Sequence, residues 1–181
     1  MLIYIIAAMD AMGGIGKKGE LPWPHMTEDM KSFMNLTTEH APHSAVVMGR
    51  KTWESLPSRH RPLKDRVNII ISTTMEQAPN GEYRVVNSLE NAIKLANKLN
   101  MYKVWVMGGA QVYKTAMESD IRFEKLFITK FTHEDKECDA FFPIDTLVGK
   151  YHTVTSSPYI TQDGYVYNMC EYESNEKHKK R

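Results

Sequence analysis

The sequence predicts a single α/β domain, with a mostly parallel central sheet flanked by helices and an antiparallel pair of strands at its C-terminal edge. Short apolar runs, the first of them MLIYIIAAM at residues 1–9, alternate with segments of helical spacing. Strands separated by helices need crossover connections, which produce parallel sheets covered on both faces. Near the end of the chain two alternating segments replace this pattern, and alternation is typical of an antiparallel edge.

Six strands are expected in the first part of the chain. The one at residues 1–9 is short, rich in isoleucine and followed by glycines, which indicates a strand buried on both faces. The others are expected at residues 45–48, 67–72, 83–86, 104–107 and 125–131. Residues 152–156 and 164–173 are expected to form the edge pair, with Asp163 and Gly164 as the turn material between them.

Helices are expected between these strands. Thr27 is a candidate N-cap for the first helix, and prolines at positions 22 and 24 keep the chain before it extended. Ser88 is the candidate N-cap of a second helix, and a third is expected at residues 110–117. The residues of the inner faces recur near i, i+3 and i+4. They are Met26, Met30, Phe33, Met34 and Thr37 in the first helix, Leu89, Ala92, Ile93, Ala96 and Leu99 in the second, and Val112, Tyr113, Ala116 and Met117 in the third.

Composition and charge are those of an ordinary globular protein. The 181 residues are 42% hydrophobic and 25% charged, enough to bury a core. The formal net charge is +1, so no large field of one sign indicates a nucleic acid or a membrane surface as partner. No apolar run reaches the roughly 18 residues of a membrane span. One domain is expected at residues 1–175, followed by a basic, disordered tail at residues 176–181.

The two cysteines, Cys138 and Cys170, do not have the spacing of a metal site or of a disulfide framework. We therefore expect reduced thiols in a cytoplasmic protein, without a bound metal. No feature of the sequence requires a second subunit, so a monomer is expected.

One acidic residue, Asp29, lies on the apolar side of the first expected helix. It comes three residues after Met26 and four before Phe33, which puts its side chain on or beside the buried face. The neighbouring Glu28 is expected to point into solvent. An acid in this place is either a first-turn charge that complements the helix dipole or a group held away from water for its chemistry.

Four unusual segments follow strand ends, where open α/β sheets bind ligands. They are residues 9–23, 49–52, 72–74 and 108–109. The segment GRKT at residues 49–52 combines a glycine, two cations and a hydroxyl at a helix start, which suits a pyrophosphate. The glycine pair at residues 108–109 precedes another helix and repeats the arrangement. The segment GGIGK at residues 13–17 lacks the third glycine of a dinucleotide-binding fingerprint, so that interpretation is rejected.

Taken together and in this order, several segments resemble the dihydrofolate reductase family. They are GGIGKKGELPWP, VVMGRKTWESLP, RPLKDRVNIIIS, VWVMGGAQVYK, and LFITKF followed by DAFFP. The match covers nearly the whole chain, and the long loops and the RPLK segment are closer to the eukaryotic than to the bacterial form. The resemblance implies the family's fold, NADPH as the cofactor and dihydrofolate as the substrate.

The resemblance also implies roles for four catalytic residues. Asp29 would be the only ionisable side chain in the pterin pocket, where it would bind the pterin amino group and a ring nitrogen and promote protonation of N5. Thr129 would hydrogen-bond Asp29 and hold its orientation. Trp23 would fix a water near the acid, and Leu21 would belong to the mobile loop that closes over the nicotinamide. The resemblance therefore favours the chemical role of Asp29 over the dipole role.

Substrate contacts follow from the same resemblance. Ile6 and Met107 would accept the pterin amino group through their backbone carbonyls, and Arg66 would bind the glutamate carboxylate of folate with its fixed guanidinium fork. The remaining substrate-binding residues would be Ala8, Phe33, Leu56, His60, Leu63 and Tyr113.

Cofactor contacts are implied at the glycine-rich strand ends, with a cis peptide bond between Gly108 and Gly109. The residues would be Ala8, Ile15, Gly16, Gly49, Arg50, Lys51, Thr52, Ser72, Thr73, Gly108, Gly109, Ala110, Gln111 and Val112. Ser72, Thr73 and Arg50 would meet the 2′-phosphate of NADPH. Asn87 stands where many relatives have a basic residue, which would weaken the preference for NADPH over NADH.

The implied reaction moves a hydride to C6 of 7,8-dihydrofolate and a proton to N5, giving 5,6,7,8-tetrahydrofolate for one-carbon metabolism and thymidylate synthesis. Folate is a further possible substrate, and antifolates such as methotrexate are the expected inhibitors. Two alternatives stay open. One is a reductase of the same architecture that acts on a pyrimidine of riboflavin synthesis and would not need Asp29 or Arg66. The other is a non-catalytic module that binds nucleotide or RNA, which the near-neutral charge disfavours.

Overall fold

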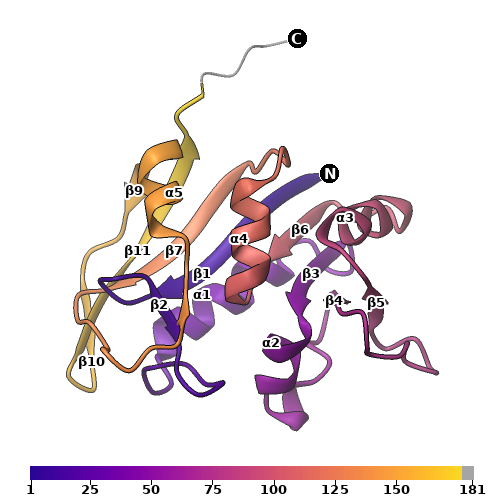
Figure 1. Ribbon diagram of the computed structural model, residues 1–181, viewed down its shortest axis with the longest axis horizontal. Coiled ribbons are helices and arrows are strands. Elements are labelled where there is room, and N and C mark those ends of the chain that lie inside the picture. The colour runs from indigo at the N-terminus through magenta and orange to yellow at the C-terminus, as the bar shows by residue number, and fades with distance from the viewer. Residues whose placement is uncertain (177–181) are drawn as a thin grey trace.

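A nine-stranded sheet forms the centre of the molecule, in the order β10-β11-β7-β1-β6-β3-β4-β5, with β9 also paired to β11 (Figure 1). The computed structural model describes residues 1–176. The strands of this sheet are β1 (Leu2–Met9), β3 (Ser44–Gly49), β4 (Val67–Ile71), β5 (Arg84–Val86), β6 (Lys103–Val106), β7 (Lys125–Phe131), β9 (Tyr151–Ser156), β10 (Ile160–Gln162) and β11 (Tyr165–Ser174). The pairs from β7 to β5 are parallel, whereas β11 runs antiparallel to β7, β9 and β10.

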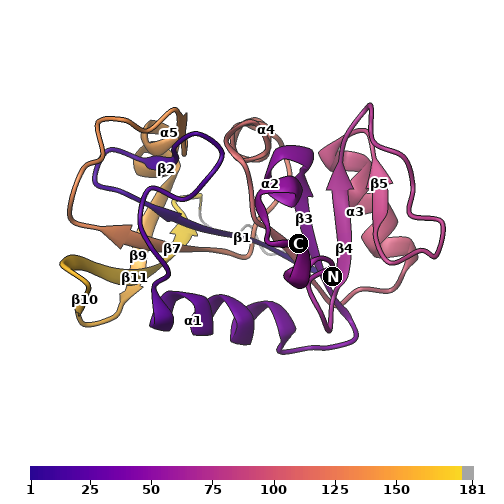
Figure 2. The same ribbon diagram turned by 90° about the horizontal axis from the view of Figure 1, so that it is seen from below.

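Within residues 1–176, five α-helices accompany these strands. They are α1 (Thr27–Thr38), α2 (Arg50–Ser55), α3 (Leu89–Lys98), α4 (Ala110–Glu118) and α5 (Ile144–Lys150), and a 3₁₀ helix, η1 (Ser58–His60), follows α2. A small second sheet pairs β2 (Gly14–Gly16) with β8 (Ala140–Phe141). Figure 2 shows α1 on one side of the central sheet and α3 and α4 on the other. None of the helices in this part of the chain has the length and apolar character needed to cross a membrane.

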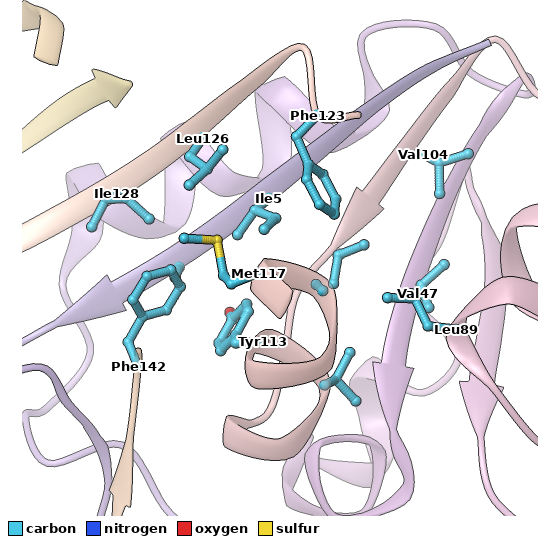
Figure 3. Packing of buried hydrophobic residues seen from close by; sticks show 14 of the residues in the cluster. Ile5, Val47, Leu89, Val104, Tyr113, Met117, Phe123, Leu126, Ile128 and Phe142 are labelled. Carbon is cyan, nitrogen blue, oxygen red and sulfur yellow. The ribbon is translucent and has the colours of Figure 1, made fainter. Parts of the chain in front are cut away.

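The parallel strands bury alternate residues in two cores. On the side of α3 and α4, Ile5, Val47 and Val104 pack with helix side chains in the larger core (Figure 3). On the side of α1, the next residues along two of these strands, Ile6 and Trp105, belong to a second core. Successive strand side chains point to opposite faces, so a continuous apolar run serves both cores. Full burial of one such side chain stabilises the fold by roughly 1.5–3 kcal/mol.

Two helix starts show how the sequence sets local structure. The Ser88 hydroxyl accepts a hydrogen bond from the backbone N–H of Asn91 at 3.1 Å, so the N-cap predicted for α3 is confirmed. The N-cap predicted for α1 is wrong, because Thr27 is the first helical residue and Met26 takes the cap position without a side-chain bond. The N–H of Thr27 donates instead to Oε1 of Gln162 at 2.9 Å, so strand β10 satisfies this helix end.

The predicted fold class is confirmed, including the mostly parallel sheet and the antiparallel pairing of β9 with β11. The turn in that edge pair differs from the prediction: Asp163 and Gly164 join β10 to β11, because an additional three-residue strand follows β9. The sequence also does not predict β2, β8 or α5, since elements of two to seven residues carry little periodicity. Of the basic tail expected at residues 176–181, residues 177–181 lie outside the described residues.

Candidate active site

The first turn of α1 holds a buried carboxylate, that of Asp29, which is 7% exposed. Thr129 of β7 donates a hydrogen bond from its hydroxyl to Oδ1 of Asp29 at 2.5 Å, so the structure contains the bond that the resemblance implied. Strand pairing puts Thr129 beside Ala8 of β1. The neighbouring Glu28 is exposed and pairs with Lys31 at 2.8 Å. The two adjacent acids therefore occupy opposite environments, one in the protein and one in solvent.

Burial raises the pKa of Asp29 above that of a free aspartic acid, because the charged carboxylate loses its hydration. The hydrogen bond from Thr129 and the nearby charge of His25 oppose this shift, since both stabilise the charged form. Within residues 1–176, Oδ2 of Asp29 accepts no hydrogen bond. An acid with a raised pKa and a free oxygen can bind an amino group and hold a proton close to a ligand.

Two buried polar atoms in the neighbouring aromatic cluster lack a hydrogen-bond partner among the described residues, Nε1 of Trp23 and the hydroxyl of Tyr167. The Trp23 ring stacks on Phe131 at a centroid distance of 4.0 Å, and Phe131 packs on Tyr167 at 5.0 Å. Burial, and after it the carboxylate of Asp29, raises the pKa of Tyr167, while the backbone N–H groups of Asp29 and Glu28 oppose the rise. Because buried N–H groups are rarely left unpaired, Nε1 of Trp23 is available to a ligand or a water, whereas the Tyr167 hydroxyl faces the backbone N–H groups of Glu28 and Asp29 at the start of α1.

The apolar residues predicted to bind substrate meet on the α1 side of the sheet. Ile6 belongs to the core on that side, and four partly buried predicted residues pack against it: Phe33, Leu56, Leu63 and Met107. Tyr113 of α4 packs in the larger core on the other side of the sheet, and its hydroxyl donates to the backbone carbonyl of Ile6 at 2.7 Å. Burial raises the pKa of Tyr113, which keeps this donor protonated. A carbonyl has two lone pairs, so that of Ile6 can still accept from a ligand.

A glycine-rich edge lies at the carboxyl ends of β3 and β6. The N–H of Gly49 donates to the carbonyl of Gly108 at 2.8 Å, and the peptide bond between Gly108 and Gly109 is cis. A Cβ on Gly49 would lie 3.3 Å from Cγ2 of Val112, and a Cβ on Gly109 would lie 3.1 Å from Oγ1 of Thr52. No side chain caps α2 or α4. The free N–H groups of these helix starts therefore lie together where a phosphate can approach the backbone.

The other predicted cofactor residues follow the ends of neighbouring parallel strands. They are Ile15 and Gly16 in β2, the small-sheet strand that follows β1, Arg50, Lys51 and Thr52 after β3, Ser72 and Thr73 after β4, and Ala110 and Gln111 after β6. Arg50 and Lys51 are exposed, and Arg50 forms an ion pair with Glu54 at 3.6 Å. Residues from four segments of the sequence are thus brought to one edge of the sheet.

Three further predicted residues lie at the margin of the site. The guanidinium of Arg66 donates to the hydroxyl of Thr37 and lies 5.7 Å from the ring centre of Phe33. Partial burial lowers the pKa of Arg66 from its ordinary value. His60 ends η1 and is exposed, and Leu21 is 51% exposed. The structure therefore places Arg66 against Phe33, beside the core on the α1 side, and leaves His60 and Leu21 at the surface.

A surface pocket of about 250 Å³ opens elsewhere, near the amino-terminal end of β4. It is lined by Arg66, Val67, Gly81, Glu82, Tyr83, Arg84, Leu99 and Met101. Arg66 alone is shared with the predicted site. Because ligands of such sheets bind at the carboxyl ends of the strands, this pocket does not mark the candidate active site.

Comparison with known proteins then identifies the family. A sequence model described as dihydrofolate reductase matches residues 2–174. The chain belongs to the dihydrofolate reductase family. It is 44% identical over 146 residues to the dihydrofolate reductase of Gallus gallus, which covers 77% of this chain and 76% of the relative. Identity to the Mus musculus enzyme is 38% over 183 residues, 93% of this chain and 95% of the relative. A viral dihydrofolate reductase from Saimiriine herpesvirus 2 is 40% identical over 151 residues, 79% of this chain and 69% of the relative.

Membership of the dihydrofolate reductase family makes the chain an oxidoreductase. Members of the family reduce dihydrofolate to tetrahydrofolate, use NADPH and bind antifolates. The predicted family and enzyme class are confirmed, and a non-catalytic binding module is excluded.

Two buried residues, Tyr167 and Asp10, are not singled out by the sequence. Tyr167 lies in an alternating strand, but periodicity gives no sign that its hydroxyl lacks a partner. Asp10 directly follows the strand buried on both faces, and an acid at the end of such a strand was the available signal.

Proposed function

We propose that this chain reduces 7,8-dihydrofolate to 5,6,7,8-tetrahydrofolate with NADPH as the hydride donor. One observation carries the proposal: the carboxylate of Asp29 is buried beside an apolar wall, is oriented by Thr129 and keeps one oxygen free. A pteridine ring with an amino group and a ring nitrogen offers two donors to such an oxygen pair.

The remaining substrate contacts extend from this acid. The carbonyls of Ile6 and Met107 accept from the pterin amino group, and the pteridine packs against Phe33. Leu56 and Leu63 line the slot for the benzoyl group, with Ala8, His60 and Tyr113 around the ring and the tail. Arg66 binds the glutamate carboxylate, a geometry that its planar fork matches. Support comes from the packing of these apolar side chains in one cluster and from the position of Arg66 over Phe33.

Asp29 also promotes protonation of N5. Burial raises the pKa of Asp29, so the protonated form persists to higher pH than in a free aspartic acid, and activity falls as the pH rises through that pKa. Trp23 fixes a water through its unpaired Nε1, which links the acid to the ring. Leu21, exposed on the loop before Trp23, closes over the reacting atoms and excludes bulk solvent.

The glycine-rich edge fits a dinucleotide. A Cβ at position 49 or 109 would make an unusually close contact, so glycine suits both positions. The helix starts beside these glycines present free N–H groups. The phosphates are bound by Arg50, Lys51 and Thr52. Ser72 and Thr73 contact the 2′-phosphate, which NADPH has and NADH lacks, so they favour NADPH. When bound, NADPH supplies the hydride. Ile15 and Gly16 line the side of the site that holds the nicotinamide. The protein thus aligns the cofactor with the substrate and keeps water away from both.

We propose further that methotrexate and related antifolates compete for the Asp29 site, and that the protein acts as a monomer in the cytoplasm. Both cysteines are free thiols, which agrees with a reducing compartment.

A spectrophotometric assay of NADPH oxidation tests this function. Dihydrofolate, folate and a pyrimidine intermediate of riboflavin synthesis are offered in parallel, with NADH in place of NADPH as a second comparison. Turnover of dihydrofolate with a preference for NADPH supports the proposal. Turnover of the pyrimidine alone, or none with dihydrofolate, contradicts it.

A further inference from the structure

Asp10, directly after β1, is 1% exposed and joins two loops that are far apart in the sequence. Its Oδ1 accepts hydrogen bonds from the backbone N–H groups of Met12 at 2.8 Å and Gly14 at 2.7 Å. Its Oδ2 accepts from the N–H of Asp135 at 2.9 Å and lies 3.7 Å from Sγ of Cys138. One carboxylate therefore holds the loop before β2 against the loop between β7 and β8.

The loop before β2 also forms backbone hydrogen bonds to the loop between β7 and β8 and to the residue that follows β8. The N–H of Ala11 donates to the carbonyl of His133 at 2.8 Å, and the N–H of Phe142 donates to the carbonyl of Gly13 at 2.8 Å. Outside them, Lys17 pairs with Asp135 at 3.5 Å. Asp10 is the buried side chain at the centre of this junction, and its partners are neutral donors.

The junction leaves no spare room. A Cβ on Gly14 would lie 2.5 Å from Sγ of Cys138 and 2.6 Å from Oδ2 of Asp10, which is closer than packed atoms approach. Position 14 therefore requires glycine because of close packing. The backbone at Gly14 packs directly on the carboxylate of Asp10 and donates a hydrogen bond to it. Gly14 is the first residue of β2, and Ile15 and Gly16 complete that strand.

We propose that Asp10 is a positioning residue for cofactor binding: its carboxylate fixes the backbone of residues 12–14 so that Ile15 and Gly16 form a preset wall on the nicotinamide side of the site. The inference rests on the proposed function, because that function makes Ile15 and Gly16 cofactor contacts. Because residues 15 and 16 are already ordered before the cofactor binds, binding does not have to order them. Loss of this order should therefore lower the affinity for the cofactor more than the affinity for the substrate.

The test compares Asp10→Asn with Asp120→Asn, an exposed aspartate after α4 that lies outside the site. The asparagine amide keeps the shape of the side chain but replaces one carboxylate oxygen by an NH₂ group. That NH₂ group then lies against a backbone N–H, and two donors meet where a hydrogen bond was. NADPH and dihydrofolate affinities are measured separately by fluorescence titration. We expect Asp10→Asn to weaken NADPH about tenfold and dihydrofolate less than about twofold.

A second readout needs no ligand. Amide hydrogen exchange in the free protein should become faster at Met12, Gly14 and Asp135 in Asp10→Asn and stay unchanged in Asp120→Asn. If Asp10→Asn does not fold, Gly14→Ala tests the same junction, because its Cβ displaces the carboxylate. The same selective loss of NADPH affinity is expected.

Unchanged NADPH affinity in a variant with faster exchange overturns the positioning role. Equal losses of NADPH and dihydrofolate affinity also overturn it, since they indicate general damage to the fold. The unmodified protein separates this result from failure of the proposed function: if it binds neither ligand and does not turn over dihydrofolate, the function itself is wrong, and the inference falls with it.

Discussion

Two regions of the molecule, the Asp10 junction and the Asp29 site, each bury a carboxylate, but they leave it in different states. Asp10 accepts three backbone hydrogen bonds and lies beside a thiol, so both oxygens are engaged. Asp29 accepts one bond, from Thr129, within the described residues. A buried acid whose oxygens are all engaged holds protein segments together, whereas one with a free oxygen is prepared for a ligand.

The largest expected effect separates the two acids by activity. Asp29→Asn removes the acid without changing its size, and hydride transfer at neutral pH should fall by about 10²–10⁴-fold. Single-turnover measurement of NADPH oxidation reports this step directly. Glu28→Gln, the exposed neighbour, is the matched control and should keep the original rate. A rate for Asp29→Asn within a few-fold of the original would remove Asp29 from its proposed role.

The next largest effect concerns stability at the Asp10 junction. Asp10→Ala leaves the buried N–H of Gly14 and the partly buried N–H groups of Met12 and Asp135 without their acceptor. The free energy of unfolding should fall by about 3 kcal/mol, since each buried polar group left unsatisfied costs about 1–3 kcal/mol. Urea denaturation measures the change, and Asp120→Ala serves as the exposed control. A loss below about 1 kcal/mol would mean that water replaces the carboxylate without cost.

Thr129 gives an effect of intermediate size on the Asp29 site. Thr129→Val removes the donor that stabilises the charged carboxylate, so the pKa of Asp29 should rise further. The falling limb of the pH–rate profile should move to higher pH, while the maximal rate drops about tenfold because the acid loses its orientation. Thr155→Val, an exposed threonine of β9, is the control. A falling limb that moves to lower pH would contradict the assigned cause of the shift.

The smallest predicted effect concerns the contribution of Asp29 to stability. Burial raises the folded-state pKa of Asp29 above its unfolded value. Its contribution to stability is therefore fully present below the unfolded pKa and is lost as the pH rises through the folded pKa. At slightly alkaline pH, the free energy of unfolding of Asp29→Asn should exceed that of the original protein by roughly 1–2 kcal/mol. This is the usual gain when a functional residue that destabilises the fold is replaced. Urea titrations at acid and alkaline pH measure this gain, and a variant that is less stable at both would contradict it.

Much of the fold is visible in the sequence because its signals are local. The alternating burial of Ile5 and Ile6 on two faces follows from one continuous apolar run, and Ser88 caps its helix as predicted. The start of α1 could not be predicted in the same way. The partner of Thr27 is Gln162, 135 residues away, and a side chain that distant leaves no local signal.

The candidate site divides along the same line. The place of Asp29 on the apolar face follows from helical spacing, but its bond to Thr129 joins residues 100 positions apart, so only the resemblance to the family predicts it. Asp10 was not predicted at all. Its partners are backbone N–H groups, which every residue except proline carries, so no residue type marks them.

The most direct measurement is a titration of the Asp29 carboxyl itself in the ligand-free protein, by carbon-13 NMR of labelled aspartate with Asp29→Asn for assignment. A midpoint above that of a free aspartic acid is predicted, because desolvation dominates over the bond from Thr129. A midpoint at or below the free value would show that the carboxylate is well solvated or fully paired, and the pocket acid would not exist.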